Sequence, residues 1–75
     1  MNRYKNLSRR SNILAYEIQP YSIWIKLKDG SNYLYTYKST GEIKVKMMHF
    51  LAASGIGLSS FIKQFAANSY AVRSE

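Results

Sequence analysis

The chain has 75 residues, of which 47% are hydrophobic and 15% aromatic, so it forms one small domain and has no room for a catalytic domain beside a binding one. This apolar content is too high for a disordered chain and supports one compact core. There is no Cys and no plausible zinc ligand set, while 11 Lys and Arg against 4 Asp and Glu give a net charge of +7, which favours an anionic partner.

The first ten residues have the composition of a flexible basic arm, because they contain several cations, no acid and few apolar side chains. The sequence therefore predicts an arm over residues 1–10, one domain over residues 11–70 and a short tail over residues 71–75. No apolar segment is continuous enough for a secretory signal or long enough to span a membrane. We expect a cytoplasmic protein with no integral membrane association.

Three strands are predicted in the first half of the domain. A short apolar run over residues 13–16 leads to Pro20, which favours a turn or a sheet edge. Residues 22–28 alternate with a period of two, and residues 31–38 are rich in β-forming types. Because Asp29-Gly30 lies between these two segments, they form a β-hairpin.

The loop length of this hairpin decides which side chains share a face, because a one-residue slip in register exchanges the two faces of a strand. A two-residue turn at Asp29-Gly30 would place Lys26 opposite Tyr33 and Trp24 opposite Tyr35. That register would expose an aromatic and basic platform.

A three-residue loop over residues 28–30 would instead place Ile25 opposite Tyr33 and Ile23 opposite Tyr35, and both tyrosines would join the core. This second register is favoured, because the first one puts polar residues of the second strand on the aliphatic face. In either register, Trp24 and Lys26 lie on the opposite face from the aliphatic row.

The next segment changes from a period of two to helical spacing. Ser39 and Glu42 have the spacing of a capping box, and Gly55 suits the left-handed position after a helix that ends near Ser54. The residues predicted at helical spacing on this helix are Ile43, Met47, Phe50 and Leu51. Residues 43–47 also alternate like a strand, but the caps and the apolar continuation favour the helix.

A second helix is predicted after Ser59 or Ser60, either of which can cap it. Its expected buried stripe contains Phe61, Ile62, Phe65 and Ala66. The order of elements predicts an α+β fold, with a three-stranded antiparallel meander followed by two helices packed on one face.

The order of several short motifs is distinctive. These are Ser11-Asn12-Ile13, Tyr16, the alternating strand to Leu27, Gly30, Tyr33-Leu34-Tyr35, Phe50 to Ser54, and Gly57 to Ile62. Over about residues 11–70 this order resembles the KTSC domain, which is named for its occurrence at the C-terminus of some lysyl-tRNA synthetases and also exists as a stand-alone bacterial protein. Tyr33-Leu34-Tyr35 matches the Tyr-x-Tyr motif of that family. The resemblance implies a role in RNA binding through the attachment to a tRNA synthetase.

The sequence does not predict an enzyme. His49 is the only histidine, and no Cys or close carboxylate pair accompanies it, so a catalytic triad, a metal site and an acid-base pair all lack members. Asp29 is explained by the turn, Glu42 by the helix cap and Glu17 by a loop edge. We expect no cofactor and no metal.

Aromatic rings can stack on any base and cations neutralise phosphates, so the outer sheet face and the arm form a candidate nucleic-acid surface. Its candidate residues are Trp24, Lys26, Tyr33, Tyr35, Lys38, Arg9 and Arg10. The small-residue loop before the second helix is a possible phosphate site, because the amides at a helix N-terminus are free. Its residues are Gly55, Gly57, Ser59 and Ser60. Each feature also has a purely structural explanation. The aromatic residues can serve strand packing, the lysines can form a solvated face, and the small-residue loop can simply connect two helices.

The sequence thus predicts a module that binds nucleic acid with low sequence specificity, RNA in preference to DNA. The alternative is a protein-interaction or homo-oligomerisation module, in which Trp24, Leu34 and nearby tyrosines form an apolar patch or an edge strand pairs with a partner. A membrane-surface role has less support, because the helical lysines are interspersed with residues expected in the core.

Overall fold

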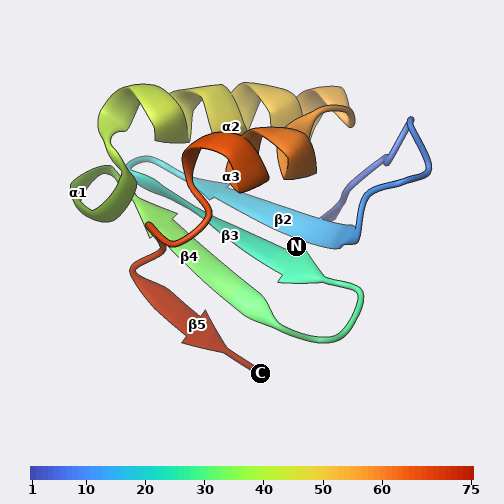
Figure 1. Cartoon of the computed structure of the whole chain (residues 1–75), viewed down its shortest axis with the longest axis horizontal. Coiled ribbons are helices and arrows are strands. Elements are labelled where there is room, and N and C mark those ends of the chain that lie inside the picture. Colours follow the sequence, from blue (N-terminus) through green and yellow to red (C-terminus); the bar gives the residue numbers. More distant parts are fainter.

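Five strands form one antiparallel sheet in the computed structural model, which describes residues 1–75. The strands lie side by side in the order of the sequence, so each pairs only with its sequence neighbours (Figure 1). They are β1 (Asn2–Arg3), β2 (Ile13–Gln19), β3 (Ser22–Leu27), β4 (Asn32–Thr36) and β5 (Val72–Ser74).

Three helices follow β4 before the chain returns to the sheet: α1 (Tyr37–Thr40), α2 (Glu42–Ser54) and α3 (Leu58–Phe65). The two longer helices lie over the same face of the sheet, and the opposite face has no helix on it (Figure 1). The predicted α+β class, the antiparallel sheet and the helices on one face are confirmed. The sheet has five strands rather than three, and a short third helix precedes the two that were predicted.

The two chain ends supply the extra strands. Asn2–Arg3 pairs with β2, and Tyr4 is buried in the core with its hydroxyl accepting a hydrogen bond from the Leu58 amide at 3.3 Å. The Leu7 amide donates to the Gly55 carbonyl at 2.8 Å. The predicted flexible arm over residues 1–10 therefore differs from the structure, in which the buried Tyr4 and the backbone hydrogen bond of Leu7 hold this segment against the fold.

The predicted tail over residues 71–75 also differs from the structure. Val72–Ser74 pairs with β4 and forms one edge of the sheet, with Tyr33 opposite Arg73. The Ala71 amide donates to the Leu34 carbonyl at 2.7 Å just before this strand. Three residues are too short a segment to show a period, so the sequence pattern alone did not indicate a strand.

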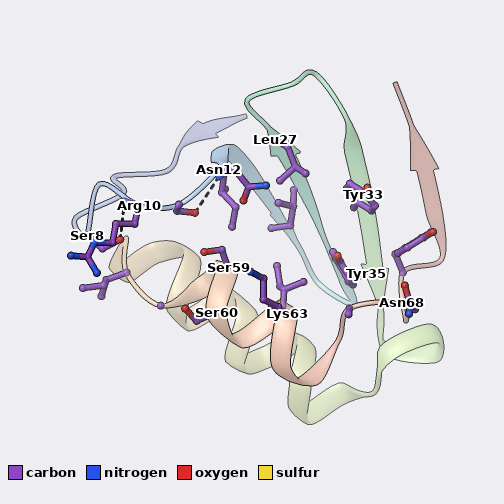
Figure 2. A pocket seen from close by; sticks show the side chains of 18 of the residues that line it. Ser8, Arg10, Asn12, Leu27, Tyr33, Tyr35, Ser59, Ser60, Lys63 and Asn68 are labelled. Atoms are coloured by element: carbon purple, nitrogen blue, oxygen red, sulfur yellow. Dashed lines mark hydrogen bonds between the residues drawn. The ribbon is translucent and has the colours of Figure 1, made fainter.

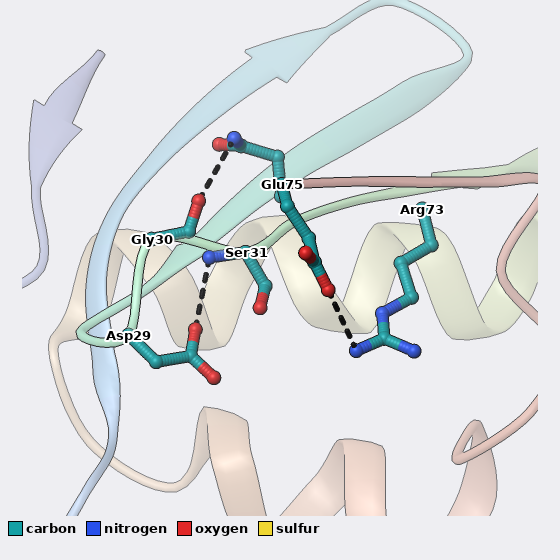
Figure 3. Close-up of polar contacts among 6 residues, drawn as sticks. Asp29, Gly30, Ser31, Arg73 and Glu75 are labelled. Atoms are coloured by element: carbon teal, nitrogen blue, oxygen red, sulfur yellow. Dashed lines mark hydrogen bonds and ion pairs between the residues drawn. The ribbon is translucent and has the colours of Figure 1, made fainter.

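The hairpin between β3 and β4 has the three-residue loop that the sequence favoured. The Leu27 amide donates to the Ser31 carbonyl at 2.8 Å, and Gly30 has a φ of +97°, a conformation that glycine adopts without strain. Oδ1 of Asp29 accepts from the Ser31 amide at 2.9 Å, and hydrogen bonding from Ser31 lowers the pKa of Asp29 (Figure 3). The sharp turn thus fixes the register of the strands.

This register places both tyrosines of the Tyr-x-Tyr motif on the helix-covered face. Ile25 lies opposite Tyr33 and Ile23 lies opposite Tyr35, as the three-residue loop predicts. The buried core comprises Tyr4, Ile13, Ile23, Ile25, Tyr35, Val45, Met48, Ala52, Leu58 and Ala66.

The face of α2 that enters this core is not the predicted one. Val45, Met48 and Ala52 are buried against the sheet, whereas Ile43, Met47 and Phe50 are exposed and Leu51 is partly buried. The helix carries two apolar stripes on opposite faces, and helical spacing fits both of them equally well. The physical reason for the error is that periodicity identifies a stripe but does not choose between two.

The helix caps are also shifted. The capping box joins Thr36 and Ser39 at the start of α1, with the Ser39 amide donating to Oγ1 of Thr36 at 2.9 Å. Ser39 is therefore already used when α2 begins after Gly41, and Glu42 forms an ion pair with Lys46 at 2.8 Å instead. At the other end of α2, the predicted Gly55 cap is confirmed, with the left-handed φ of +81°.

The second predicted helix is confirmed as α3, with differences in its cap and its buried face. Gly57, rather than Ser59 or Ser60, occupies the N-cap position, and no side chain caps this end. Leu58 and Ala66 are buried, while Phe65 is exposed because it lies on the side of the helix that faces solvent. Phe61 and Ile62 are partly buried against the core.

Because α2 has a buried and an exposed apolar stripe, the same substitution in two neighbouring methionines is expected to have very different effects on stability. Met48→Ala removes a fully buried side chain and is expected to lower the free energy of unfolding by about 2–5 kcal/mol. Met47→Ala changes an exposed side chain and is expected to change it by less than about 0.5 kcal/mol. Urea denaturation followed by circular dichroism measures both. A larger cost for Met47→Ala would mean that the other stripe faces the sheet.

Two glycines with positive φ provide a matched test of the packing of the N-terminal segment. Gly30→Ala meets no atom within 4 Å and is expected to cost about 1–2 kcal/mol from backbone strain alone. Gly55→Ala carries the same strain and also places a Cβ 2.6 Å from Cβ of Lys5. We expect it to cost at least about 1 kcal/mol more in urea denaturation. Equal costs would contradict the close approach of residues 4–7 to the end of α2.

Candidate functional site

A groove of about 860 Å³ lies between α3 and the helix-covered face of the sheet. We call it the α3 groove. Figure 2 shows Ser59 and Lys63 on α3, Tyr33 and Tyr35 on β4, and Arg10 on the N-terminal segment around this space. Segments from the beginning, middle and end of the chain therefore contribute to one site.

The charged side chains of the α3 groove are all positive. Arg10, Lys63 and Arg73 line it, and no Asp or Glu does. The only acid paired with these cations is Glu75, whose carboxylate lies 3.6 Å from the Arg73 guanidinium in an exposed ion pair (Figure 3). An exposed pair of this kind contributes little and exchanges readily for another anion. The groove therefore has the charge to attract an anionic ligand.

A cluster of tyrosines forms the sheet side of the groove. The ring of Tyr70 meets Tyr33 edge-on with centroids 5.0 Å apart, and Tyr35 edge-on at 6.4 Å. The Arg73 guanidinium lies 5.6 Å from the centroid of the Tyr33 ring, an arrangement favourable for a cation-π interaction. Tyr33 and Tyr70 are partly exposed, so part of this aromatic surface is accessible from the groove.

Tyr35 has a structural position in this cluster. Only 3% of it is exposed, so its ring is not available to stack on a base, contrary to the role predicted for it. Burial, with smaller effects of Tyr33 and Tyr70, raises the pKa of Tyr35 to about 12. Its hydroxyl therefore stays neutral far above physiological pH.

The predicted phosphate loop is divided between two roles. Gly57, Ser59 and Ser60 line the α3 groove at the first turn of α3, where hydroxyl and backbone donors face the same space as the cations. Gly55 is buried, ends α2 and lies against Lys5, so it forms no part of the groove. The first amide of α3, that of Leu58, already donates to Tyr4.

A second, smaller hollow of about 320 Å³ adjoins the α3 groove, and Ile13 lines both. We call it the N-terminal hollow. Its charged side chains are again all positive: Arg3, Lys5, Arg9 and Lys28. The two hollows together contain seven of the 11 Lys and Arg residues and none of the 4 acids. We call this pair of hollows the basic surface.

The other predicted binding residues lie elsewhere. Trp24 and Lys26 are on the sheet face that no helix covers, and Glu17 is the cross-strand neighbour of Trp24. Lys38 is exposed on α1, at the far end of the strands from the hairpin loop. The structure therefore brings Arg10 and Tyr33 together with the α3 loop, separates both from Trp24 and Lys26, and places Arg9 in the N-terminal hollow.

Several residues of the basic surface were not predicted as binding residues. Lys63 and Arg73 are cations of the α3 groove, and Tyr70 completes its aromatic cluster. Lys63 lies on α3, whereas the place of Arg73 depends on β5 pairing with β4, which no sequence pattern indicated. A search for cations that the two chain ends bring to one face would have found them only once the strand order was known.

The single histidine has a structural partner. Nε2 of His49 donates to the Ser22 carbonyl at 2.8 Å and connects α2 to the start of β3. No group of three or more His, Cys, Asp or Glu side chains is arranged to hold a metal ion, and no helix is long and apolar enough to cross a membrane. No family model, curated protein or solved structure matched the chain. The resemblance to the KTSC domain stays a prediction.

The raised pKa of Tyr35 predicts a loss of stability at alkaline pH. The unfolded chain ionises this tyrosine near pH 10 and the folded chain only near pH 12, so the folded state binds more protons between these values. Stability is therefore complete below about pH 10 and falls by at most about 1.4 kcal/mol per pH unit up to about pH 12. Urea denaturation of Tyr35→Phe beside the wild type measures this, and an identical pH dependence in both proteins would contradict it.

Proposed function

We propose that this protein binds single-stranded nucleic acid on the basic surface, with RNA preferred to DNA and with low sequence specificity. The observation that carries the proposal is the segregation of charge: two adjoining hollows hold most of the cations and no acid. A polyanion gains from such an arrangement by releasing counterions from its phosphates. The attraction between cations and phosphates does not depend on the order of the bases, so binding of this kind has low sequence specificity.

The α3 groove has the chemistry to contact more than phosphate. The Arg73 guanidinium above Tyr33 provides a planar cation on an aromatic ring, and bases stack on both kinds of surface. Side-chain hydroxyls and amides at the groove, among them Ser59, Ser60 and Asn68, can donate to phosphate or ribose oxygens. The whole molecule measures only 30 × 24 × 22 Å, so a groove within it suits a single strand rather than a duplex.

The uncovered sheet face is less suited to phosphate. Trp24 and Lys26 offer a ring and a cation there, but Glu17 lies directly beside Trp24 on the neighbouring strand. A carboxylate at this position repels a phosphate backbone that approaches the indole ring. This local charge favours the basic surface over the face that the sequence indicated.

The preference for RNA is supported by the resemblance to the KTSC domain, which occurs attached to a tRNA synthetase. We infer a cytoplasmic binding module rather than an enzyme, because the single histidine and two of the four acids have structural partners. His49 bonds to a backbone carbonyl, Glu42 to Lys46, and Asp29 to its own turn.

The proposal predicts which cations control binding of labelled RNA. In fluorescence anisotropy with single-stranded RNA, Arg10→Gln and Lys63→Gln are each expected to weaken binding about fivefold at 0.1 M salt, and to reduce the slope of log K against log salt by about 0.7. Lys26→Gln and Lys38→Gln remove the same charge elsewhere and are the matched controls. Single-stranded DNA and duplex RNA in the same assay test the preference for single-stranded RNA.

Three outcomes would contradict the proposal. Equal weakening by all four Lys and Arg variants would mean that net charge alone attracts RNA. A loss of about 1–3 kcal/mol in Trp24→Ala, with the groove variants unaffected, would move the site to the uncovered sheet face. An absence of binding even at low salt would reject nucleic acid as the ligand.

A further inference from the structure

The solvent-facing side of α2 carries a continuous apolar seam. Ile43, Met47 and Phe50 are 84%, 44% and 67% exposed, and they lie on the opposite side of the helix from the buried Val45 and Met48. Large apolar side chains that recur along one exposed helix face mark an interaction surface more often than isolated ones do. We call these three residues the α2 seam.

The spacing of the seam is that of a helix-helix interface. The residues are separated by four and then three positions, which is the alternation of d, a and d positions in a heptad. Ser54 occupies the next a position at the end of the helix. In this phase Lys44 is an e position and Lys46 is a g position, so one lysine flanks the seam on each side.

The positive charge of the chain argues against a second copy as the occupant. In a parallel pair, g positions face e positions of the partner, and in an antiparallel pair they face g positions. An antiparallel pair would place Lys46 opposite Lys46 of the second copy, a parallel pair would place it opposite Leu51, and in both orientations each protomer carries a charge of +7. A partner helix with acidic residues at its e and g positions matches the flanking lysines in either orientation. Repulsion between these lysines and basic partners adds to the preference for an acidic helix.

We propose that the α2 seam docks an acidic amphipathic helix of another protein. The apolar a and d residues of that helix pack on Ile43, Met47 and Phe50, while its Glu or Asp side chains at e and g pair with Lys44 and Lys46. Lys46 now pairs with Glu42 at 2.8 Å, but both side chains are more than half exposed. Such a pair exchanges partners at little cost.

This surface is separate from the proposed nucleic-acid site. No residue of the seam and neither flanking lysine lines the α3 groove or the N-terminal hollow. The seam lies on the side of α2 away from the buried Val45 and Met48, whereas the α3 groove lies between α3 and the sheet (Figure 2). A bound helix and a bound nucleic acid strand therefore use different residues, and each can be removed by mutation without the other.

The test uses the full chain and two designed peptides of four heptads, with Leu at a and d and either Glu or Lys at e and g. In isothermal titration the Glu peptide is expected to bind at least about tenfold more tightly than the Lys peptide. Phe50→Ser is expected to abolish this binding, because it removes the larger of the two d side chains of the seam. Phe65→Ser, which changes an exposed phenylalanine of α3 outside the seam, is the matched control and is expected to bind normally.

Charge reversal provides the sharper arm. The double variant Lys44→Glu, Lys46→Glu is expected to reverse the preference, so that the Lys peptide binds about tenfold more tightly. A Glu peptide of the same composition but scrambled order is expected not to bind, and Arg10→Gln with Lys63→Gln is expected to leave binding unchanged. If the scrambled peptide binds as tightly as the Glu peptide, or if the groove variants lose binding of the Glu peptide, the peptide is attracted to the basic surface. Either result would overturn the proposal.

Two other occupants are outcomes of the same experiment. A protein that is dimeric in light scattering, and becomes monomeric with Phe50→Ser, would assign the seam to self-association instead. The protein could also sediment with vesicles of phosphatidylserine and phosphatidylcholine. If Phe50→Ser abolished this sedimentation and the protein showed no preference for the Glu peptide, the seam would be assigned to a lipid surface. Either result would overturn docking of an acidic helix.

Discussion

The register between β3 and β4 is the constraint on which the rest of the structure depends. A loop of three residues, with Gly30 in a left-handed conformation and Asp29 bonded to the Ser31 amide, sets Ile25 opposite Tyr33 and Ile23 opposite Tyr35. A slip of one residue would exchange the faces of β4 and move both tyrosines to solvent. The helix layer would then lose the aromatic part of its core, and the α3 groove would lose one wall.

The same register gives the molecule two chemically different sides around the sheet. The helix-covered side holds Tyr33, Tyr35 and Tyr70 together with the cations of the α3 groove, Arg10, Lys63 and Arg73. The uncovered side keeps Trp24, Lys26 and Glu17, where opposite charges are mixed. The two hollows of the basic surface together hold seven of the 11 Lys and Arg residues and no acid, and the aromatic cluster lies in the α3 groove.

Sequence patterns predicted the elements that have local signals. The hairpin, the αL glycine after α2 and the presence of two main helices follow from turn chemistry and periodicity, which act over a few residues. The edge strands did not follow, because Asn2–Arg3 and Val72–Ser74 are too short for a period and pair only when the rest of the sheet exists. Part of the basic surface was missed for the same reason, since Arg3 and Arg73 are on those edge strands. The orientation of α2 was missed because both of its faces are apolar.

The position of Trp24 has a consequence for spectroscopy. It is the only tryptophan in the chain, and it lies on the uncovered sheet face, with the whole sheet between it and the α3 groove and with the helix layer on the far side. Its emission therefore reports the integrity of the sheet while staying insensitive to occupancy of the groove or of α2. Three of the seven tyrosines, Tyr33, Tyr35 and Tyr70, line the groove, so these rings and the indole lie on opposite sides of the same sheet.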